Sequence, residues 1–261
     1  MKKYFQIIIF PVVVFFAFSS CKPKEKTAPE VPPEKSISID FSYFIDPPDS
    51  TGNYAHAFQT NFYWENLLTD SLTLYKNMLN TISGKKLDFQ DKNTWLATGL
   101  LNSGVDKYDI SYFEIVHPDS VETKMFFTLD STYTDLLLFD GYFFPDSTVG
   151  YRQINKPDTG NTSLKFLKID WNIVSETKKE IKFTNILTDN SKNGSFVFYK
   201  DSVDSQYNIY FDFFDKTTDN HTLVEYNKTN NYGRIKDEQF YGDTIWHCWD
   251  NNRADIDCPP K

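Results

Sequence analysis

The sequence predicts a mainly β (α+β) fold, in which an antiparallel meander forms a curled sheet or half-barrel with N-terminal helices packed on it. The chain has 261 residues, 40% of them hydrophobic, which is enough to bury a core. Aromatic residues make up 17% of the chain, and aromatic side chains favour strands. Beyond Lys107, apolar and polar residues alternate with the two-residue period of half-buried strands.

Three elements are expected before this alternating region. Residues 36–44 alternate polar and apolar side chains, which indicates a half-buried strand that ends at two prolines. Residues 54–83 contain no proline or glycine and place apolar residues at helical spacing, with Asp70 as the cap of a second helix in this stretch. A further short helix is expected at residues 94–102, followed by Ser103-Gly104.

The rest of the chain consists of strand-like segments separated by turn-forming residues. Sequences rich in Pro, Asp, Asn and Gly stand between these segments, as turns require. The predicted strands are Asp109–His117, Glu122–Leu129, Leu136–Phe144, Val149–Ile154, Ser163–Val174, Glu180–Leu187, Ser195–Tyr199, Tyr207–Phe214, Thr222–Tyr226 and Tyr232–Lys236. This spacing favours one antiparallel sheet, and whether the sheet is a half-barrel, a closed barrel or a sandwich stays open.

The first residues have the composition of an export signal. Lys2 and Lys3 precede an apolar run that ends at residue 18, too short for a typical membrane span. The sequence Phe18-Ser19-Ser20-Cys21 resembles the lipobox of bacterial lipoproteins, and its Phe departs from the usual Leu as in Bacteroidetes lipoproteins. This resemblance implies that residues 1–20 are removed and that Cys21 carries the acyl chains, palmitate among them, that anchor the protein.

The resemblance also implies a location, whereas the composition of the following residues indicates the domain organisation. Lys22 stands where enterobacterial lipoproteins of the inner membrane carry an aspartate, so an outer-membrane location is expected, facing either the periplasm or the cell surface. Residues 21–35 comprise the lipidated Cys and a flexible tether rich in Pro, Lys and Glu. Residues 36–261 are expected to form a single β-rich domain.

The order of the elements, helices followed by a long antiparallel run, resembles the lipoprotein-carrier-like half-barrels. In that architecture a curved sheet wraps an apolar groove that helices plug. The resemblance implies an apolar ligand in the groove, whereas the many aromatic residues of the strands would otherwise fill a core.

The C-terminal segment contains the most distinctive residues. It is similar to the C-terminal ends of uncharacterised Bacteroidetes outer-membrane lipoproteins, through the sequence Trp-His-Cys-Trp-Asp at residues 246–250 and Asp257-Cys258. Because exported thiols are oxidised, Cys248 and Cys258 are expected to form a disulfide. Trp246 and Trp249 would either pack the last strand on the sheet or offer a platform for stacking a sugar.

Two further groups of polar residues are candidate sites. Oxygen-bearing side chains between the two cysteines form a weak candidate metal site, and the alternative is a solvated loop without a cofactor; they are Asp250, Asn252, Asp255 and Asp257. The motif Asp-[Ser/Thr]-[Ala/Ile/Leu/Val/Met/Thr] resembles the O-glycosylation acceptor of Bacteroidetes. Its candidate acceptors are Ser50, Ser120, Ser131, Ser147 and Ser202.

Composition and motifs narrow the function classes. The pI near 4.9 argues against a nucleic-acid partner, because phosphates require a basic surface. No metalloprotease, serine-hydrolase or phosphate-loop motif occurs in the chain, so the sequence favours a role without catalysis. The expected function is a membrane-anchored binding or structural module for an apolar ligand. The alternative is a glycan-binding or glycan-processing component.

Overall fold

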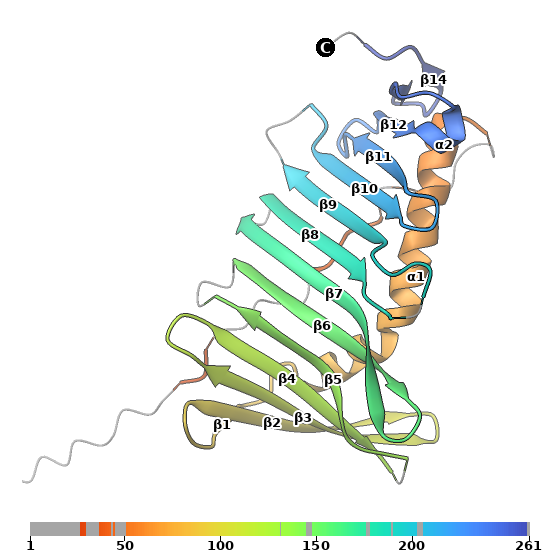
Figure 1. The fold of residues 1–261 in the computed structure, drawn as a ribbon. Helices are drawn as coiled ribbons and strands as arrows, with labels where there is room; N and C mark the ends of the chain where they lie inside the picture. Colours follow the sequence, from red (N-terminus) through yellow and green to blue (C-terminus); the bar gives the residue numbers. More distant parts are fainter. Residues whose placement is uncertain are drawn as a thin grey trace, which may run out of the picture.

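The computed structural model describes residues 27–29, 37–42, 44, 51–130, 132–144, 148–175, 178–188, 190–202 and 206–259. The export signal, the tether from Cys21 to residue 26 and the remaining tether residues other than 27–29 lie outside these residues, so their expected roles stay predictions. The described chain consists of two helices and one large antiparallel sheet (Figure 1).

The sheet is a continuous meander in which every strand pairs with its neighbours in the sequence. The helices are α1 (Asn53–Ile82) and α2 (Glu238–Tyr241). The strands, in sheet order, are β1 (Asp88–Phe89), β2 (Thr94–Ser103), β3 (Asp106–Val116), β4 (Val121–Leu129), β5 (Tyr133–Phe143), β6 (Val149–Asp158), β7 (Thr162–Ser175), β8 (Lys178–Asn185), β9 (Phe196–Ser202), β10 (Ile209–Asp215), β11 (Asn220–Tyr226), β12 (Gly233–Asp237), β13 (His247–Trp249) and β14 (Asp255–Ile256). The mainly β, antiparallel fold class is confirmed, and the ten predicted strands correspond to β3 through β12.

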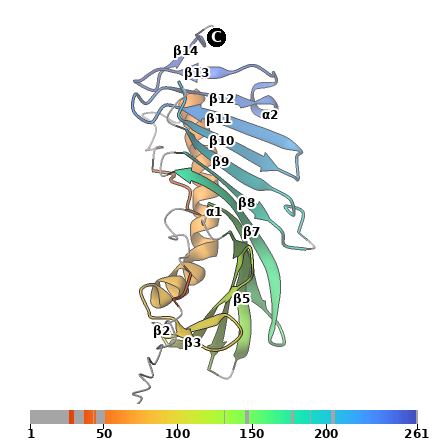
Figure 2. The ribbon, with the colours of Figure 1, turned by 90° about the vertical axis from the view of Figure 1, so that its left-hand side faces the viewer.

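The long helix α1 lies across one face of the sheet and runs nearly perpendicular to the strands (Figures 1 and 2). Its N-terminal end contacts β12 and β13, and its C-terminal end contacts β2 and β3. A helix of 30 residues is about 45 Å long, and ten strand spacings of about 4.8 Å cover about 48 Å. The single helix is therefore long enough to span most of the sheet, about the distance from β2 to β12.

The two faces of the sheet differ in composition. Inward residues of the strands between β2 and β13, such as Ile110, Phe139 and Phe211, are almost fully buried and belong to one hydrophobic cluster that includes residues of α1. Outward residues alternate charges and rings, as in the ion pair between Lys200 and Glu180 on neighbouring strands. The sheet curves round α1 and stays open, because β1 and β14 at its two ends do not pair with each other.

The prediction of a short helix at residues 94–102 is wrong, because these residues form β2. Leu, Ala and Trp in this stretch are compatible with a helix, but all ten residues of β2 pair with β3. At Gly99, an added Cβ would stand 3.0 Å from side-chain atoms of Ile82 and Thr81 at the end of α1. The strand thus passes directly beneath the last turn of the helix.

The N-terminal part also differs from the expectation. The sequence predicts a strand at residues 36–44. The structure describes residues 37–42 and 44 of this stretch, and these residues form no strand and do not pair with the sheet. Their alternating apolar side chains instead enter the space beside α1. In addition, α1 continues through Asp70 without interruption, so Asp70 does not start a second helix.

Two inward glycines allow a tryptophan of the next strand to lie flat on the sheet. Gly150 pairs with Trp171, and Gly233 pairs with Trp249. At either glycine an added Cβ would come within 2.8 Å of Cε2 of the indole. Both tryptophans are buried, so the glycines fix how the indoles pack in the core.

Candidate functional site

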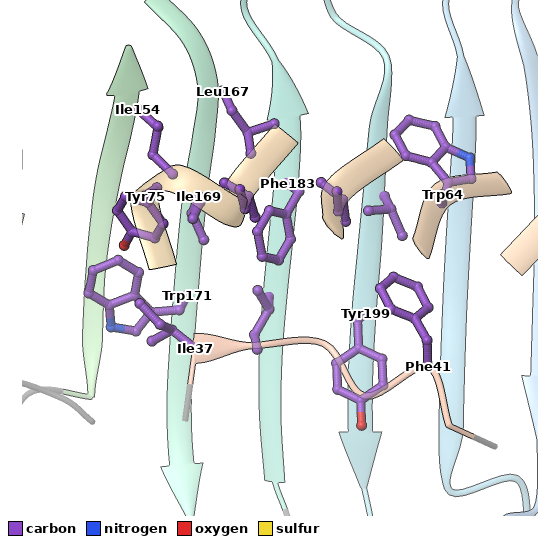
Figure 3. Packing of buried hydrophobic residues seen from close by; sticks show 14 of the residues in the cluster. Ile37, Phe41, Trp64, Tyr75, Ile154, Leu167, Ile169, Trp171, Phe183 and Tyr199 are labelled. Atoms are coloured by element: carbon purple, nitrogen blue, oxygen red, sulfur yellow. The ribbon is translucent and has the colours of Figure 1, made fainter. Parts of the chain in front are cut away.

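The concave side of the sheet forms a groove that is shared by α1 and the strap, which we define as residues 37–42 and 44. The strap lies beside α1 over the strands, and its side chains Ile37 and Phe41 are buried against the sheet (Figure 3). Phe44, which is also buried, contacts the ring of Tyr226. The ring of Phe41 stacks on Phe211, with centroids 5.9 Å apart. The strap therefore occupies part of the groove that the sequence predicts for an apolar ligand.

A cavity of about 290 Å³ remains between the strap, α1 and the middle of the sheet. Ile169 and Phe183 of the sheet and Leu72 of the helix provide its apolar wall. Polar side chains of the strap and of the helix complete the lining, and the charged ones are Asp40, Glu65 and Lys76. An apolar wall with polar groups beside it suits an amphiphilic molecule.

Lys179 of β8 contacts the strap beside this cavity. Its ammonium group donates a hydrogen bond to the backbone oxygen of Ser38 at 3.2 Å. Burial lowers the pKa of Lys179, although the nearby carboxylate of Asp201 acts in the opposite direction. This contact links the backbone of the strap to the sheet.

A buried guanidinium group connects α1 to the sheet. Arg152 of β6 is 1% exposed, and its Nη1 donates to the hydroxyl of Tyr75 on α1. The guanidinium carbon lies 4.7 Å from the ring centroid of Phe139, and the rings of Tyr75 and Trp171 are also within 6 Å. Cation–π attraction compensates part of the cost of burying this charge.

A carboxyl group lies fully buried on the same face of the sheet. Glu114 of β3 has no exposed surface, and its Oε1 accepts a hydrogen bond from Tyr112 at 3.0 Å. Burial raises the pKa of Glu114 to about 7, although the bond from Tyr112 acts in the opposite direction. Glu114 is therefore largely protonated below neutral pH.

The start of α1 is fixed by a second buried carboxylate, Asp237 at the end of β12. It accepts hydrogen bonds from His56 of α1 at 2.9 Å and from Thr222 at 2.7 Å. Although burial acts in the opposite direction, these bonds and one from Asn220 hold the pKa of Asp237 well below its ordinary value. Asp237 thus stays ionised and holds the helix on the last strands of the sheet.

The C-terminal end contains the expected disulfide, between Cys248 and Cys258, with Cα atoms 5.1 Å apart. The two tryptophans beside it do not form a shared platform. Trp249 is 1% exposed and lies on Gly233 in the core. Trp246 is half-buried and contacts the guanidinium of Arg234. Trp249 therefore has no free ring face for a sugar.

The structure separates the oxygen-bearing residues of the weak metal candidate. Asp250 accepts hydrogen bonds from the backbone of its own loop, at Asn252 and Ala254. Asp255 accepts from the backbone of Asn53 at the start of α1. The described part of the chain holds no group of three or more His, Cys, Asp or Glu side chains that suits a metal, and Asp257 joins no such group.

The candidate O-glycosylation residues are only partly described. Ser120 lies between β3 and β4, where its hydroxyl is 3.3 Å from the carboxylate of Asp119. Ser202 is the last residue of β9. Ser50, Ser131 and Ser147 lie outside the described residues.

Sequence reasoning missed Arg152, Glu114 and the strap as features of the groove. The first two could have been found from the alternation, because Arg152 is in phase with Ile154 and Glu114 with Tyr112, both inward positions. A charged residue at an inward position of a strand indicates a buried polar contact.

Replacing Glu114 by Gln is expected to remove a pH dependence of stability. The pKa of Glu114 is about 7 in the folded protein and 4.5 in the unfolded chain. The contribution of Glu114 to the stability of the fold is therefore largest below pH 4.5 and declines as the pH rises through 7. The free energy of unfolding of the wild type should therefore fall by about 3 kcal/mol, relative to that of Glu114→Gln, as the pH rises from 4.5 to 8. Urea unfolding at both pH values measures this difference. Parallel pH profiles for the two proteins would contradict it, and Glu238→Gln, in an exposed residue, is the control.

Comparisons with known proteins do not indicate a function for the groove. No family model, curated protein or solved structure matches the chain. Among the described residues, no helix combines the length and the apolar character that crossing a membrane requires. The function is therefore inferred from the groove and from the N-terminal sequence.

Proposed function

We propose that this protein is a lipid-anchored binding module of the outer membrane, without catalytic activity, that holds an amphiphilic ligand in the groove between α1 and the sheet. The observation that carries the proposal is the cavity of about 290 Å³ between the strap, α1 and the sheet. Its volume lies near the lower end of the range for ligand pockets, about 300–1,000 Å³. It suits one short apolar chain better than a whole lipid.

The chemistry of the cavity supports a ligand with an apolar chain and a polar head. The chain would contact Ile169, Phe183 and Leu72, whose burial excludes water. The head would lie near Asp40 and Lys76, where an acceptor can bind the ammonium group.

The N-terminal sequence supports the membrane anchor. The lipobox-like residues end at Cys21, and the tether leads directly into the strap, which begins at Ile37 among the described residues. An acylated Cys21 would hold the groove close to a bilayer, a source of amphiphilic molecules.

The alternative, a glycan-binding or glycan-processing role, loses one of its supports. The sugar platform of Trp246 and Trp249 requires two exposed rings, but Trp249 is buried.

Replacing Cys21 by Ser is expected to abolish lipidation. Without the thiol no diacylglycerol can be attached, so the protein should lose its label from an alkyne-bearing palmitate and leave the membrane fraction. Click labelling and fractionation of cells that produce the full chain measure both effects. Cys258→Ser is the matched control, which should keep the label. Labelling of Cys21→Ser at the wild-type level would contradict the anchor.

Blocking the mouth of the cavity is expected to abolish ligand binding without unfolding the protein. Thr69 lines the cavity on the exposed side of α1, whereas Thr73, one turn further, is exposed outside it. A Trp at position 69 should fill the entry, so Thr69→Trp should weaken the binding of laurate at least about tenfold, or 1.4 kcal/mol. Isothermal titration calorimetry with sodium laurate measures this.

The matched control for this experiment is Thr73→Trp, which adds the same indole to the same helix. It should bind laurate as wild type does. Equal affinity of Thr69→Trp and Thr73→Trp, or absence of laurate binding to the wild-type protein, would contradict the proposed groove site.

A further inference from the structure

Three loops meet at one end of the sheet, near its C-terminal edge. They connect β9 to β10, β11 to β12 and β13 to β14. In an antiparallel meander every second connection emerges at the same end of the strands. The described parts of these loops are residues 206–208, 227–232 and 250–254. They surround a pocket of about 490 Å³.

Hydrogen bonds within the loops give this pocket a defined shape. Asn227 is the centre: its amide nitrogen donates to the backbone oxygen of Gln206 at 2.8 Å and lies 3.2 Å from the hydroxyl of Tyr232. Its amide oxygen accepts from the backbone of Thr229 and Asn230. The first two loops are therefore tied together.

The disulfide holds the third loop. Cys248, which also lines the pocket, is joined to Cys258 on the far side of residues 250–254. Asp250 accepts hydrogen bonds from two backbone groups of this loop, which fixes its turn. Hydrogen bonds and the disulfide thus hold the loops of the pocket in place.

Aromatic residues form much of the pocket wall. Tyr207 and Tyr232 lie edge to face, with ring centroids 5.7 Å apart. Gly233 and the buried Trp249 lie side by side in the lining, and Ile256 adds an apolar side chain. Such walls can contact the apolar face of a ring.

Three exposed amide side chains complete the lining, those of Gln206, Asn230 and Asn251. Within the part of the chain that the structure describes, these three amides form no hydrogen bond with the protein. Each amide offers two donors and one acceptor oxygen. They can therefore bind groups that both donate and accept, as hydroxyls do.

The charge of the pocket restricts its ligand to a neutral molecule. The lining contains no Lys, Arg or His, so an anion would find no partner. Its one carboxylate, Asp250, is engaged by backbone groups. Arg234 lies behind the lining, with its guanidinium carbon 4.6 Å from the ring centroid of Tyr207, and its charge is paired with Glu225.

We propose that this pocket, formed by the loops after β9, β11 and β13, binds a neutral saccharide. The ring of Tyr232 contacts the C–H face of a sugar ring, beside Tyr207, over whose ring the guanidinium of Arg234 already lies. The amides of Asn230 and Asn251 bind the hydroxyls of the sugar. The site is separate from the groove beside α1, and it differs from a Trp246–Trp249 platform in both position and residues.

Saturation-transfer NMR with neutral oligosaccharides tests this proposal. The probes are tri- to hexasaccharides of glucose, galactose, mannose, xylose and N-acetylglucosamine, each at up to about 5 mM so that affinities in the millimolar range are detected. At least one probe should bind, and Asn230→Ala/Asn251→Ala should weaken that binding at least about tenfold. Both residues are exposed, so the fold is expected to remain intact.

The matched control is Asn77→Ala/Asn80→Ala, which removes two exposed amides from α1 and should bind the same probe as wild type does. No bound probe in the whole series, or equal affinity of the two double variants, would overturn the saccharide site. Neither result depends on laurate binding in the groove, so this site and the proposed function fail separately.

Discussion

The packing of α1 against the concave face of the sheet is the contact on which the rest of the structure depends. A sheet with one apolar face needs a second layer, and in the described chain one helix of 30 residues provides most of it. Asp237 fixes the start of this helix, and Arg152 contacts its C-terminal half at Tyr75. The absence of a side chain at Gly99 leaves room for its last turn. One helix does not fill the whole concave face, so the strap and the cavity occupy the space that remains beside it (Figure 3).

The alternating pattern alone was sufficient to predict the central ten strands and their order. Hairpins connect neighbours in the sequence, so the register follows from local turns and from the buried face. The pattern failed at β2 and at the strap for opposite reasons. β2 contains good helix formers and becomes a strand because β3 pairs with it. The strap alternates like a strand, but its described residues use the alternation to insert side chains beside α1.

The candidate sites were less predictable, because each combines residues that are far apart in the chain. Tyr75 and Arg152 are 77 residues apart in the sequence, and no local sequence pattern predicts that they contact each other. The pocket near the C-terminal edge follows from the meander, which brings every second loop to one end. The segment around Trp249 was distinctive in the sequence for a structural reason, since this indole packs on Gly233 and its neighbour Cys248 forms the disulfide.

α1 and the strap together cover the concave face, and the cavity that they enclose on the sheet is the proposed site of the amphiphilic ligand. Amide hydrogen exchange of residues 37–44 and of α1, with and without laurate, tests this most directly. Because the described strap makes no ladder with a strand, its amides should exchange at least about tenfold faster than those in the middle of α1, and laurate should change exchange in the strap. Equal protection of both segments, unaffected by laurate, would contradict the account.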